Sequence, residues 1–234
     1  DSLMAFKEKH GLRIIEDAAH AFGSTYKGSK IGSYGDITCF SFGSQKNITC
    51  GEGGAILSDD EDFDNLCRQK RLLGMDRKSH SSSSWKERSW MYDVPVQGYR
   101  YHMSNINAGI GLAQLKKVDS FLARRREMCG KYDTALKDIP GIRFRKVDYS
   151  TIGAHIYVIR ILNGRRDDLK KFLMERDIET GVSFIPNHFH SFYKNEGLSR
   201  PETEQAFKEI VSLPLHSELQ LQTCLLSTGR RVVF

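Results

Sequence analysis

The chain has 234 residues, of which 39% are hydrophobic and 27% charged, a composition typical of a globular protein with one large domain or two small ones. Its formal net charge of +6 favours partners that carry phosphate, such as nucleotides or nucleic acid. The basic residues are scattered, so the nucleic-acid hypothesis rests on net charge alone and no nucleic-acid partner is expected. The cluster Arg124-Arg125-Arg126 falls inside a helical pattern and is expected to form a solvated helix face.

The five cysteines are widely spaced and form no Cys-x-x-Cys pair, so they indicate neither a disulfide framework nor a zinc site. No metal site is expected. No run approaches the roughly 20 apolar residues of a membrane span, and no secretion signal opens the chain. These patterns predict a soluble protein of the reducing cytoplasm with no membrane partner.

The first elements alternate between helix and strand. Residues 2–10 are expected to form a helix that ends at Gly11, and "LRIIED" then predicts a short buried strand that ends in two carboxylates. The glycine- and serine-rich stretch "STYKGSKIGSYGD" predicts a turn or hairpin. The runs "ITCFSF" and "GGAILS" predict two further strands. This alternation favours a largely parallel sheet.

A second helix and a long loop follow. Asp59 or Asp60 is expected to cap a helix over residues 61–73, which Gly74 ends. Residues 75–101 show little periodicity and contain the polar stretch "SHSSSSWKERSW", so they predict a long loop. Long loops in compact domains are often functional.

From Ser104 the pattern is helical until Pro140 stops it, which predicts one helix of roughly 30 residues or more. Its first half is rich in small residues and its second half is charged, so it is expected to leave one domain and enter another. We expect a large domain over residues 1–125 and a small α/β domain over residues 126–234. In the second, "IRFRKV", "HIYVIRI" and "TGVSFI" predict strands, and "RDDLKKFLMER" and "SRPETEQAFKEIV" predict helices.

Two charged side chains follow the ends of predicted strands. Asp17 ends "LRIIED", and Lys46 comes between "ITCFSF" and the flexible turn "GEGG". Open α/β sheets bind ligands beyond the carboxyl ends of their strands, which makes the pair a candidate site. The alternatives are that Asp17 only caps the next turn and that Lys46 is a solvated turn lysine. Glu16 should point to the opposite face of the strand, so Glu16 and Asp17 make a poor pair of acid and base.

If Asp17 and Lys46 meet, they suit one cofactor in particular. Pyridoxal phosphate has a carbonyl that reacts with a lysine amine and a basic ring nitrogen that pairs with a carboxylate. The sequence pattern alone does not establish that the two side chains meet.

Longer motifs around these residues resemble those of a known family. The segment "IIEDAAHAFGSTYKGSKIGSYGDITCFSFGSQKNITCGEGGAILS", together with "GYRYHMSNINAGIGLAQL" and "SLPLHSEL", closely resembles the DegT/DnrJ/EryC1/StrS family of pyridoxal-phosphate-dependent nucleotide-sugar aminotransferases. The resemblance runs in register over nearly the whole chain. It implies an α/β fold: the second part of a fold-type-I (aspartate aminotransferase-like) large domain, followed by a small C-terminal α/β domain.

The resemblance also implies roles for individual residues. Lys46 would carry the cofactor covalently and move the substrate proton, and Asp17 would keep the pyridine nitrogen protonated. His20 would lie near the ring hydroxyl of the cofactor, and Ser41 would bind its phosphate. From the sequence alone, His20 is more typical of a packing residue and Ser41 of a neutral strand residue. Glu52 is expected to shape the turn beside the lysine.

Further roles are implied at the substrate and at a dimer interface. The family forms homodimers with shared active sites, in which a "G-x-N-x-R-M" segment reaches the cofactor phosphate of the partner. Here the segment reads "GYRYHM", so Arg100 is the candidate ligand, and His102 departs from the pattern. Arg100 could equally bind a nucleotide phosphate. His188, His190 and Tyr193 fall where the small domain approaches the sugar substrate, and the alternative for them is a packed loop.

The implied activity is transfer of an amino group from glutamate, which leaves 2-oxoglutarate, to a keto group of a nucleotide-linked deoxysugar. The resemblance favours the C4 keto group of a keto-6-deoxyhexose, in the biosynthesis of amino sugars and polysaccharides such as lipopolysaccharide. Lys46 argues against the family's dehydratases, which have histidine at this position.

One part of the family pattern is not found in this sequence. It is the N-terminal portion, with its phosphate-binding turn and the aromatic residue that stacks on the cofactor ring. The chain is therefore expected to be an incomplete product or one half of a split enzyme. The alternatives to a complete enzyme are a non-catalytic or regulatory family member, or a fragment that binds partners without turnover.

Overall fold

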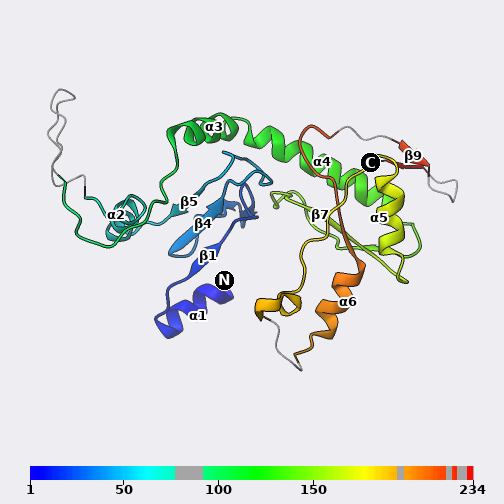
Figure 1. Cartoon of the computed structure of the whole chain (residues 1–234), viewed down its shortest axis with the longest axis horizontal. Coiled ribbons are helices and arrows are strands. Elements are labelled where there is room, and N and C mark those ends of the chain that lie inside the picture. The colour runs from blue at the N-terminus through cyan, green and yellow to red at the C-terminus, as the bar shows by residue number, and fades with distance from the viewer. Residues whose placement is uncertain (77–91, 194–197, 220–222, 226–230, 234) are drawn as a thin grey trace. The chain divides into compact units, whose positions relative to one another are not determined.

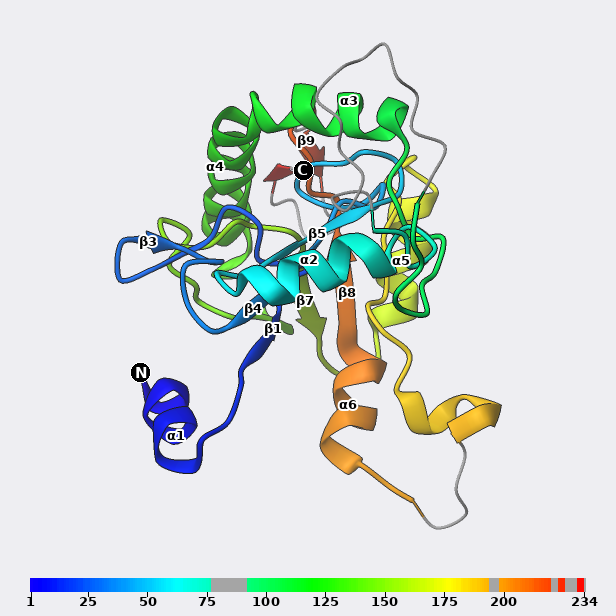
Figure 2. The same ribbon diagram turned by 90° about the vertical axis from the view of Figure 1, so that its left-hand side faces the viewer.

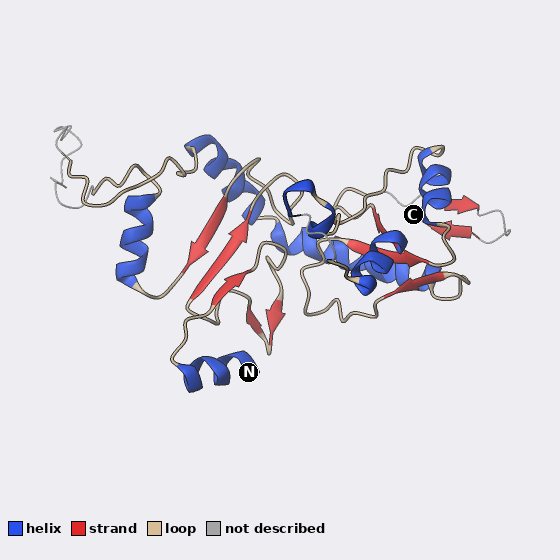
Figure 3. Cartoon of the chain, turned by 60° about the horizontal axis from the view of Figure 1, so that its bottom comes forward, coloured by secondary structure: helices blue, strands red, loops and turns tan. Residues whose placement is uncertain are grey.

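The computed structural model describes residues 1–76, 92–193, 198–219, 223–225 and 231–233. The chain divides into two compact units (Figure 1), the first made of residues 1–22 and 29–116 and the second of residues 23–28 and 117–234. The division between Lys116 and Lys117 lies before the boundary that we expected after residue 125. Each unit contains helices and a three-stranded sheet (Figure 3), in agreement with the predicted α/β class.

The sheet of the first unit has the strand order β1-β4-β5, where β1 is Ile15–Asp17, β4 is Ile37–Ser41 and β5 is Gly54–Leu57. All three strands lie in runs predicted to form strands. β1 and β4 are parallel, but β5 is antiparallel to β4, so the prediction of a largely parallel sheet is wrong for this strand. The chain reverses in the loop between β4 and β5. Phe42 N donates to Gly53 O at 2.8 Å and closes this loop.

In the first unit, one helix ends and another begins where local signals predict. α1 (Ser2–His10) ends at Gly11, whose φ of 61° is the left-handed conformation that glycine adopts readily. α2 (Glu61–Lys70) begins after Asp60, whose side chain accepts a hydrogen bond from Phe63 N at 3.0 Å. Figures 1 and 2 show α2 beside the sheet. Short-range capping chemistry therefore determines both helix ends.

The long helix expected after Ser104 is two helices, α3 (Asn105–Leu115) and α4 (Val118–Leu136). Ser104 is the N-cap of α3, as predicted. The break comes at Lys117, whose φ of −107° and ψ of −3° depart from the values of about −63° and −42° of an α-helix. The prediction of one continuous helix is therefore wrong, and α3 and α4 belong to different units.

The hairpin predicted in the glycine-rich stretch is present. It consists of β2 (Thr25–Tyr26) and β3 (Ser29–Lys30). Residues 23–28 are fixed within the second unit, where Thr25 N donates to Thr151 O at 2.7 Å.

The sheet of the second unit has the order β6-β7-β8 and is antiparallel throughout. β6 (Ile142–Phe144) and β7 (Tyr157–Ile161) lie in the predicted strands. β8 (Ile210–Leu213) includes residues that we expected to continue a helix. The helix stops early because Val211, at 0% exposure, is buried in the sheet beside β7.

The strand predicted at residues 180–185 is not formed. This part of the chain makes only an isolated bridge between Gly181 and Ser212. The remaining described elements of the second unit are α5 (Arg166–Met174), η1 (Asn187–Phe189), η2 (Ser191–Tyr193), α6 (Pro201–Glu209), β9 (Thr223–Leu225) and β10 (Arg231–Val233). Of these, α5 and α6 confirm the two helices predicted for this unit.

The second unit has its own hydrophobic core between α4, α5 and the sheet. Its buried residues are Cys129, Tyr132, Leu136, Ala154, Tyr157, Ile159, Ile161, Leu173, Val211 and Leu213. Tyr132 stacks at a tilt on Tyr157 with ring centroids 4.8 Å apart, and its hydroxyl donates to Pro214 O at 2.8 Å. The buried hydroxyl therefore has the hydrogen-bond partner that its burial requires.

The arginine cluster of α4 is not a solvated face. Arg125 is 6% exposed and donates to one carbonyl in each of the loops 152–155 and 215–219, at 3.2 and 2.8 Å. Arg124 donates to the second loop at 3.1 Å and Arg126 to the first at 3.3 Å. Burial lowers the pKa of Arg125. The cluster therefore holds two loops against α4, and the solvated-face prediction is wrong.

Candidate functional site

The candidate site lies beyond the ends of two neighbouring strands. Asp17 ends β1, and the loop that carries Lys46 follows β4. Because β1 and β4 are parallel, their carboxyl ends meet at the same edge of the sheet. The two loops are also tied directly, since the buried Asn47 donates its Nδ2 to Phe22 O at 3.1 Å. The fold therefore brings the chain after Asp17 next to the chain around Lys46.

The loop that carries Lys46 is closed by hydrogen bonds to its own backbone. Phe42 O, at its start, accepts from Cys50 N at 3.0 Å and from Thr49 Oγ1 at 3.2 Å. Lys46 N donates to Gly43 O at 3.0 Å, which forms a tight turn inside the loop. Lys46 is half-buried. The lysine thus projects from a turn whose two ends are held together.

The charges of Asp17 and Lys46 both act on His20. Partial burial lowers the pKa of His20 from its ordinary value of 6.5, the Lys46 ammonium lowers this pKa further, and the Asp17 carboxylate opposes the shift. His20 therefore lies within electrostatic reach of both Lys46 and Asp17. The neighbour Glu16 accepts from Thr38 Oγ1 at 2.9 Å on the opposite face of β1, as the alternation of a strand predicts.

Asp17 also caps the turn that follows it. Its Oδ1 accepts from Ala19 N at 3.1 Å, an arrangement typical of aspartate at the start of a turn. The two interpretations of Asp17 are compatible, because this bond engages one carboxylate oxygen and Asp17 is exposed.

The pKa of His20 can be measured without any cofactor. NMR titration of the full chain should give His20 a midpoint below the ordinary value of 6.5. Lys46→Met removes a positive charge and should raise that midpoint, whereas Asp17→Asn removes a negative charge and should lower it. The other histidines serve as internal references. A midpoint that neither substitution moves would show that the three groups do not interact.

Ser41 and Glu52 each place a side-chain oxygen near Gly43. Ser41 Oγ accepts from Gly43 N at 3.4 Å. A Cβ placed on Gly43 would lie 3.7 Å from Ser41 Oγ and 3.7 Å from Glu52 Oε2. The hydroxyl and the carboxylate therefore face the same glycine in the loop of Lys46. Lys46 supplies an amine and Asp17 a carboxylate at this edge of the sheet, which are the groups that suit a carbonyl compound with a basic ring nitrogen.

Arg100 lies in a segment that pairs with the end of α2. It is exposed and forms an isolated bridge with Leu72. Its neighbours Tyr99 and Tyr101 stack with ring centroids 4.9 Å apart and an interplanar angle of 6°. The neighbouring bond from Leu73 N to Tyr99 O, at 2.9 Å, holds the segment in place. The role of Arg100 as a phosphate ligand stays a prediction.

The three residues predicted to contact the sugar belong to the second unit. His188 lies on η1, and its Nε2 is 3.1 Å from Glu204 Oε1. His190 and Tyr193 are exposed, and Tyr193 makes an edge-to-face contact with Phe192 at 5.1 Å between ring centroids. A ligand at His188 would have to share this histidine with Glu204, and the substrate role of all three residues stays a prediction.

The polar side chains that hold the site together were not predicted from the sequence. Asn47 ties the two loops, and Asn107 on α3 donates to Glu52 O at 3.1 Å. In the sequence, Asn47 is marked only by its position beside Lys46. Asn107 is marked only by its position three residues after the N-cap Ser104. Neither signal identifies the carbonyl on the other segment, because that pairing depends on the folded chain.

The described residues contain neither a candidate membrane span nor a candidate metal-binding cluster. No helix there is both long and apolar enough to cross a membrane. In the same part of the chain, no three or more His, Cys, Asp or Glu side chains are grouped so that they could hold a metal ion.

The order of these motifs and their geometry match one family. The model of the DegT/DnrJ/EryC1/StrS aminotransferase family matches residues 1–224. The chain belongs to this family. The spore coat polysaccharide biosynthesis protein SpsC of Bacillus subtilis is 36% identical over 229 residues, which cover 94% of this chain and 59% of SpsC. These matches confirm the family predicted from the motifs around Asp17 and Lys46.

Solved structures of similar proteins support the fold. Helicobacter pylori PseC, an aminotransferase involved in the biosynthesis of pseudoaminic acid, matches with a TM-score of 0.80 and 26% identity over 94% of this chain and 58% of PseC. The PLP form of Spr1654 from Streptococcus pneumoniae matches with a TM-score of 0.78 and 30% identity over 92% of this chain and 56% of Spr1654. These matches confirm the predicted fold-type-I class. The chain spans just over half the length of these relatives.

Proposed function

We propose that the whole protein is a pyridoxal-phosphate-dependent aminotransferase that acts on a nucleotide-linked keto-deoxysugar. The observation that carries this proposal is the parallel pairing of β1 with β4, which places Asp17 and the loop of Lys46 at one edge of the sheet. The charges of both groups act on His20 there, and the chain belongs to a family of aminotransferases. The named roles of SpsC in polysaccharide biosynthesis and of PseC in pseudoaminic acid biosynthesis support a sugar substrate.

The residues present fit the cofactor. When bound, pyridoxal phosphate supplies a carbonyl that links to amines and a ring that accepts electrons. Lys46 would hold the carbonyl, and Asp17 would hold a proton on the ring nitrogen. Ser41 would donate a hydrogen bond to the phosphate of its own cofactor, Arg100 would donate to the cofactor phosphate of the partner protomer, and His20 would lie beside the ring. The lowered pKa of His20 means that this side chain is neutral near pH 7 and adds no positive charge there.

The chemistry of the chain itself is proton transfer by Lys46. Its Nζ takes a proton from the carbon of the amino donor that bears nitrogen, and later gives a proton to the former keto carbon of the sugar. One residue therefore serves both halves of the reaction. Asp17 would hold the proton on the ring nitrogen in both halves of the reaction.

The proposal also names the two substrates, the residues that contact the sugar and the assembly of the protein. Glutamate is the amino donor with 2-oxoglutarate as its product, and the acceptor is the C4 keto group of a keto-6-deoxyhexose. His188, His190 and Tyr193 contact the sugar. The protein forms a homodimer with shared active sites and works in the cytoplasm, in amino-sugar and polysaccharide biosynthesis.

An isotope-transfer assay tests the reaction. Full-length protein, pyridoxal phosphate and ¹⁵N-glutamate are incubated with a nucleotide 4-keto-6-deoxyhexose, and the amino sugar is analysed by mass spectrometry. We expect ¹⁵N at C4 and little product from the matched 3-keto sugar. Asp17→Asn should reduce turnover more than cofactor affinity, because Asp17 acts on the ring nitrogen.

The alternatives give different results in the same assay. Label at C3 alone would overturn the assignment of the keto position. Cofactor uptake without transfer to either sugar would favour a non-catalytic or regulatory family member. A full-length protein that takes up no pyridoxal phosphate would overturn the enzyme proposal.

A further inference from the structure

The first turn of α3 contacts the loop that carries Lys46. Asn107 Nδ2 donates to Glu52 O at 3.1 Å. The same side chain is held from its other side, because Ser104 Oγ donates to Asn107 Oδ1 at 3.0 Å and accepts from Asn107 N at 3.1 Å. The Asn107 amide is thus oriented by the cap of its own helix and uses its NH₂ group to hold the loop.

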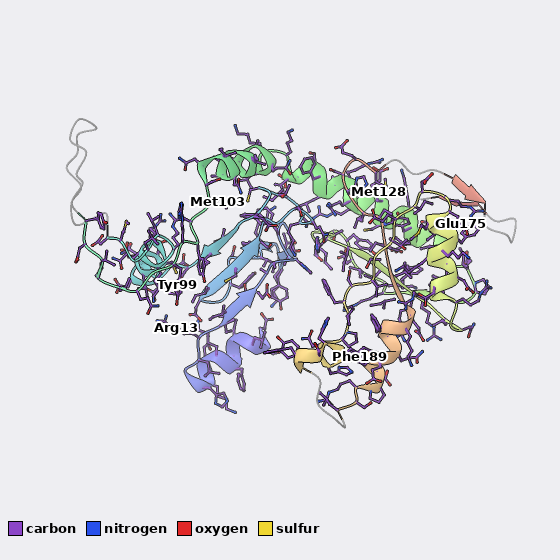
Figure 4. The ribbon with its side chains drawn as sticks, in the orientation of Figure 1. Arg13, Tyr99, Met103, Met128, Glu175 and Phe189 are labelled. Atoms are coloured by element: carbon purple, nitrogen blue, oxygen red, sulfur yellow. The ribbon has the colours of Figure 1, made fainter. Side chains whose placement is uncertain are left out.

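The carbonyl that Asn107 holds lies where the loop is closely packed. Cys50, at 1% exposure, donates its Sγ to the same Glu52 O at 3.3 Å. A Cβ on Gly53 would come within 2.6 Å of both Cys50 Sγ and Met103 Cε, so glycine is required at this position. Met103, labelled in Figure 4, immediately precedes the N-cap of α3. A change in the position of α3 is therefore transmitted to this part of the loop.

The packed part of the loop is bonded to the turn of Lys46. Gly53 O accepts from Phe42 N at 2.8 Å, and Phe42 O accepts from Cys50 N at 3.0 Å. These two bonds close the loop around Lys46. If the bond to Glu52 O were lost, both ends of this loop would gain freedom.

The segment before α3 carries a second predicted cofactor ligand. Arg100 lies four residues before Ser104, and Met103 packs on Gly53 between them. The start of α3 is therefore bonded to the loop of Lys46 and is continuous with the segment of Arg100. Because Arg100 is predicted to reach the cofactor phosphate of the partner protomer, the start of α3 lies between the loop of one active site and the segment predicted to serve the other.

We infer that Asn107 is a positioning residue, which holds the Glu52–Gly53 end of the lysine loop on α3 and so positions Lys46. The assignment of Lys46 to the cofactor rests on the proposed function. The hydrogen bond from Asn107 to the loop is independent of it.

A pair of matched variants separates this role from helix stability. Asn107→Asp keeps the size of the side chain and its acceptor for Ser104, but places a carboxylate oxygen against Glu52 O. An acidic residue in the first turn of a helix favours the helix, so α3 should stay folded. Asn105→Asp makes the same chemical change two residues earlier in α3, at an exposed position.

The first measurement is hydrogen exchange in the cofactor-free full-length protein. We expect the amides of Phe42 and Cys50 to exchange roughly fivefold faster in Asn107→Asp than in Asn105→Asp, the factor that corresponds to one ordinary hydrogen bond. The second is the NMR midpoint of His20. It should rise in Asn107→Asp alone, because a freer loop lets the Lys46 ammonium move away from His20. The third is the affinity for pyridoxal phosphate, which should fall by about fivefold.

The outcomes separate this inference from the proposed function. Equal exchange rates in the two variants would overturn the role of Asn107. Faster exchange with an unchanged His20 midpoint and unchanged cofactor affinity would show that Asn107 stabilises the loop without positioning Lys46. If the unsubstituted protein binds no pyridoxal phosphate at Lys46, the proposed function fails, whereas exchange and the His20 midpoint still decide whether Asn107 positions the lysine.

Discussion

Replacement of Lys46 with alanine is expected to abolish the covalent capture of pyridoxal phosphate by this chain. That link forms only with a primary amine. Lys46 supplies one from the loop after β4, where it is half-buried on a turn closed by backbone hydrogen bonds. Turnover should fall by at least about 10²–10⁴-fold, the usual contribution of a side chain that transfers a proton. The measurement is borohydride reduction in the presence of the cofactor, followed by mass mapping of the peptide that contains residue 46.

Lys46→Arg is the control for charge. It keeps a positive charge beside His20, so the pKa of His20 should stay lowered, but its guanidinium does not capture the carbonyl. Both variants should therefore lose the labelled peptide, and only Lys46→Ala should change the histidine titration. A labelled peptide that persists in Lys46→Ala would show that another amine holds the cofactor.

Leu173→Ala is expected to destabilise the second unit by about 2–5 kcal/mol. Leu173 is 0% exposed on α5 and belongs to the core formed with α4 and the sheet β6-β7-β8. The substitution removes buried apolar surface and leaves a cavity that the close-packed neighbours fill only in part. The loss should be measured by urea unfolding followed through the NMR ring signals of Tyr132 and Tyr157, which lie in this core.

The next residue provides the control. Met174 is 72% exposed on the same helix, so Met174→Ala should change the free energy of unfolding by no more than about 0.5 kcal/mol. The two units have separate cores and need not unfold in one step, so the tyrosine transition should be analysed by itself. Equal effects of the two substitutions would contradict the burial of Leu173.

The features predicted correctly from the sequence depend on residues close together in the chain. Gly11 ends α1 because glycine adopts a positive φ readily, and Asp60 begins α2 through a bond to a backbone amide three residues away. Ser104 begins α3 in the same way. The apolar run of β4 is bounded by polar and glycine-containing turns on both sides. Such signals act within one turn or one strand, so they can be recognised in the sequence without knowledge of the fold.

The wrong predictions concern residues whose environment is set by distant parts of the chain. Helical periodicity continues past Lys117, but the helix is interrupted at this residue, where the first unit ends and the second begins. The helical pattern of residues 199–211 includes Ile210, yet this residue pairs with Arg160 of β7. The helical pattern around Arg125 predicts a solvated side chain, yet Arg125 is buried and donates to carbonyls of two loops that lie far along the chain.

For the site, the sequence by itself determined the residue types and their order: a carboxylate at the end of one strand, a lysine after the next, and the motifs that identify the family. Only the tertiary structure decided that Asp17 and the loop of Lys46 lie together at one edge of the sheet, because this requires the parallel pairing of β1 with β4. It also decided that Asn47 and Asn107 hold the loop. The physical reason is that capping and strand formation depend on neighbours in the chain, whereas pairing between loops depends on hydrogen bonds that form only after the sheet brings them together.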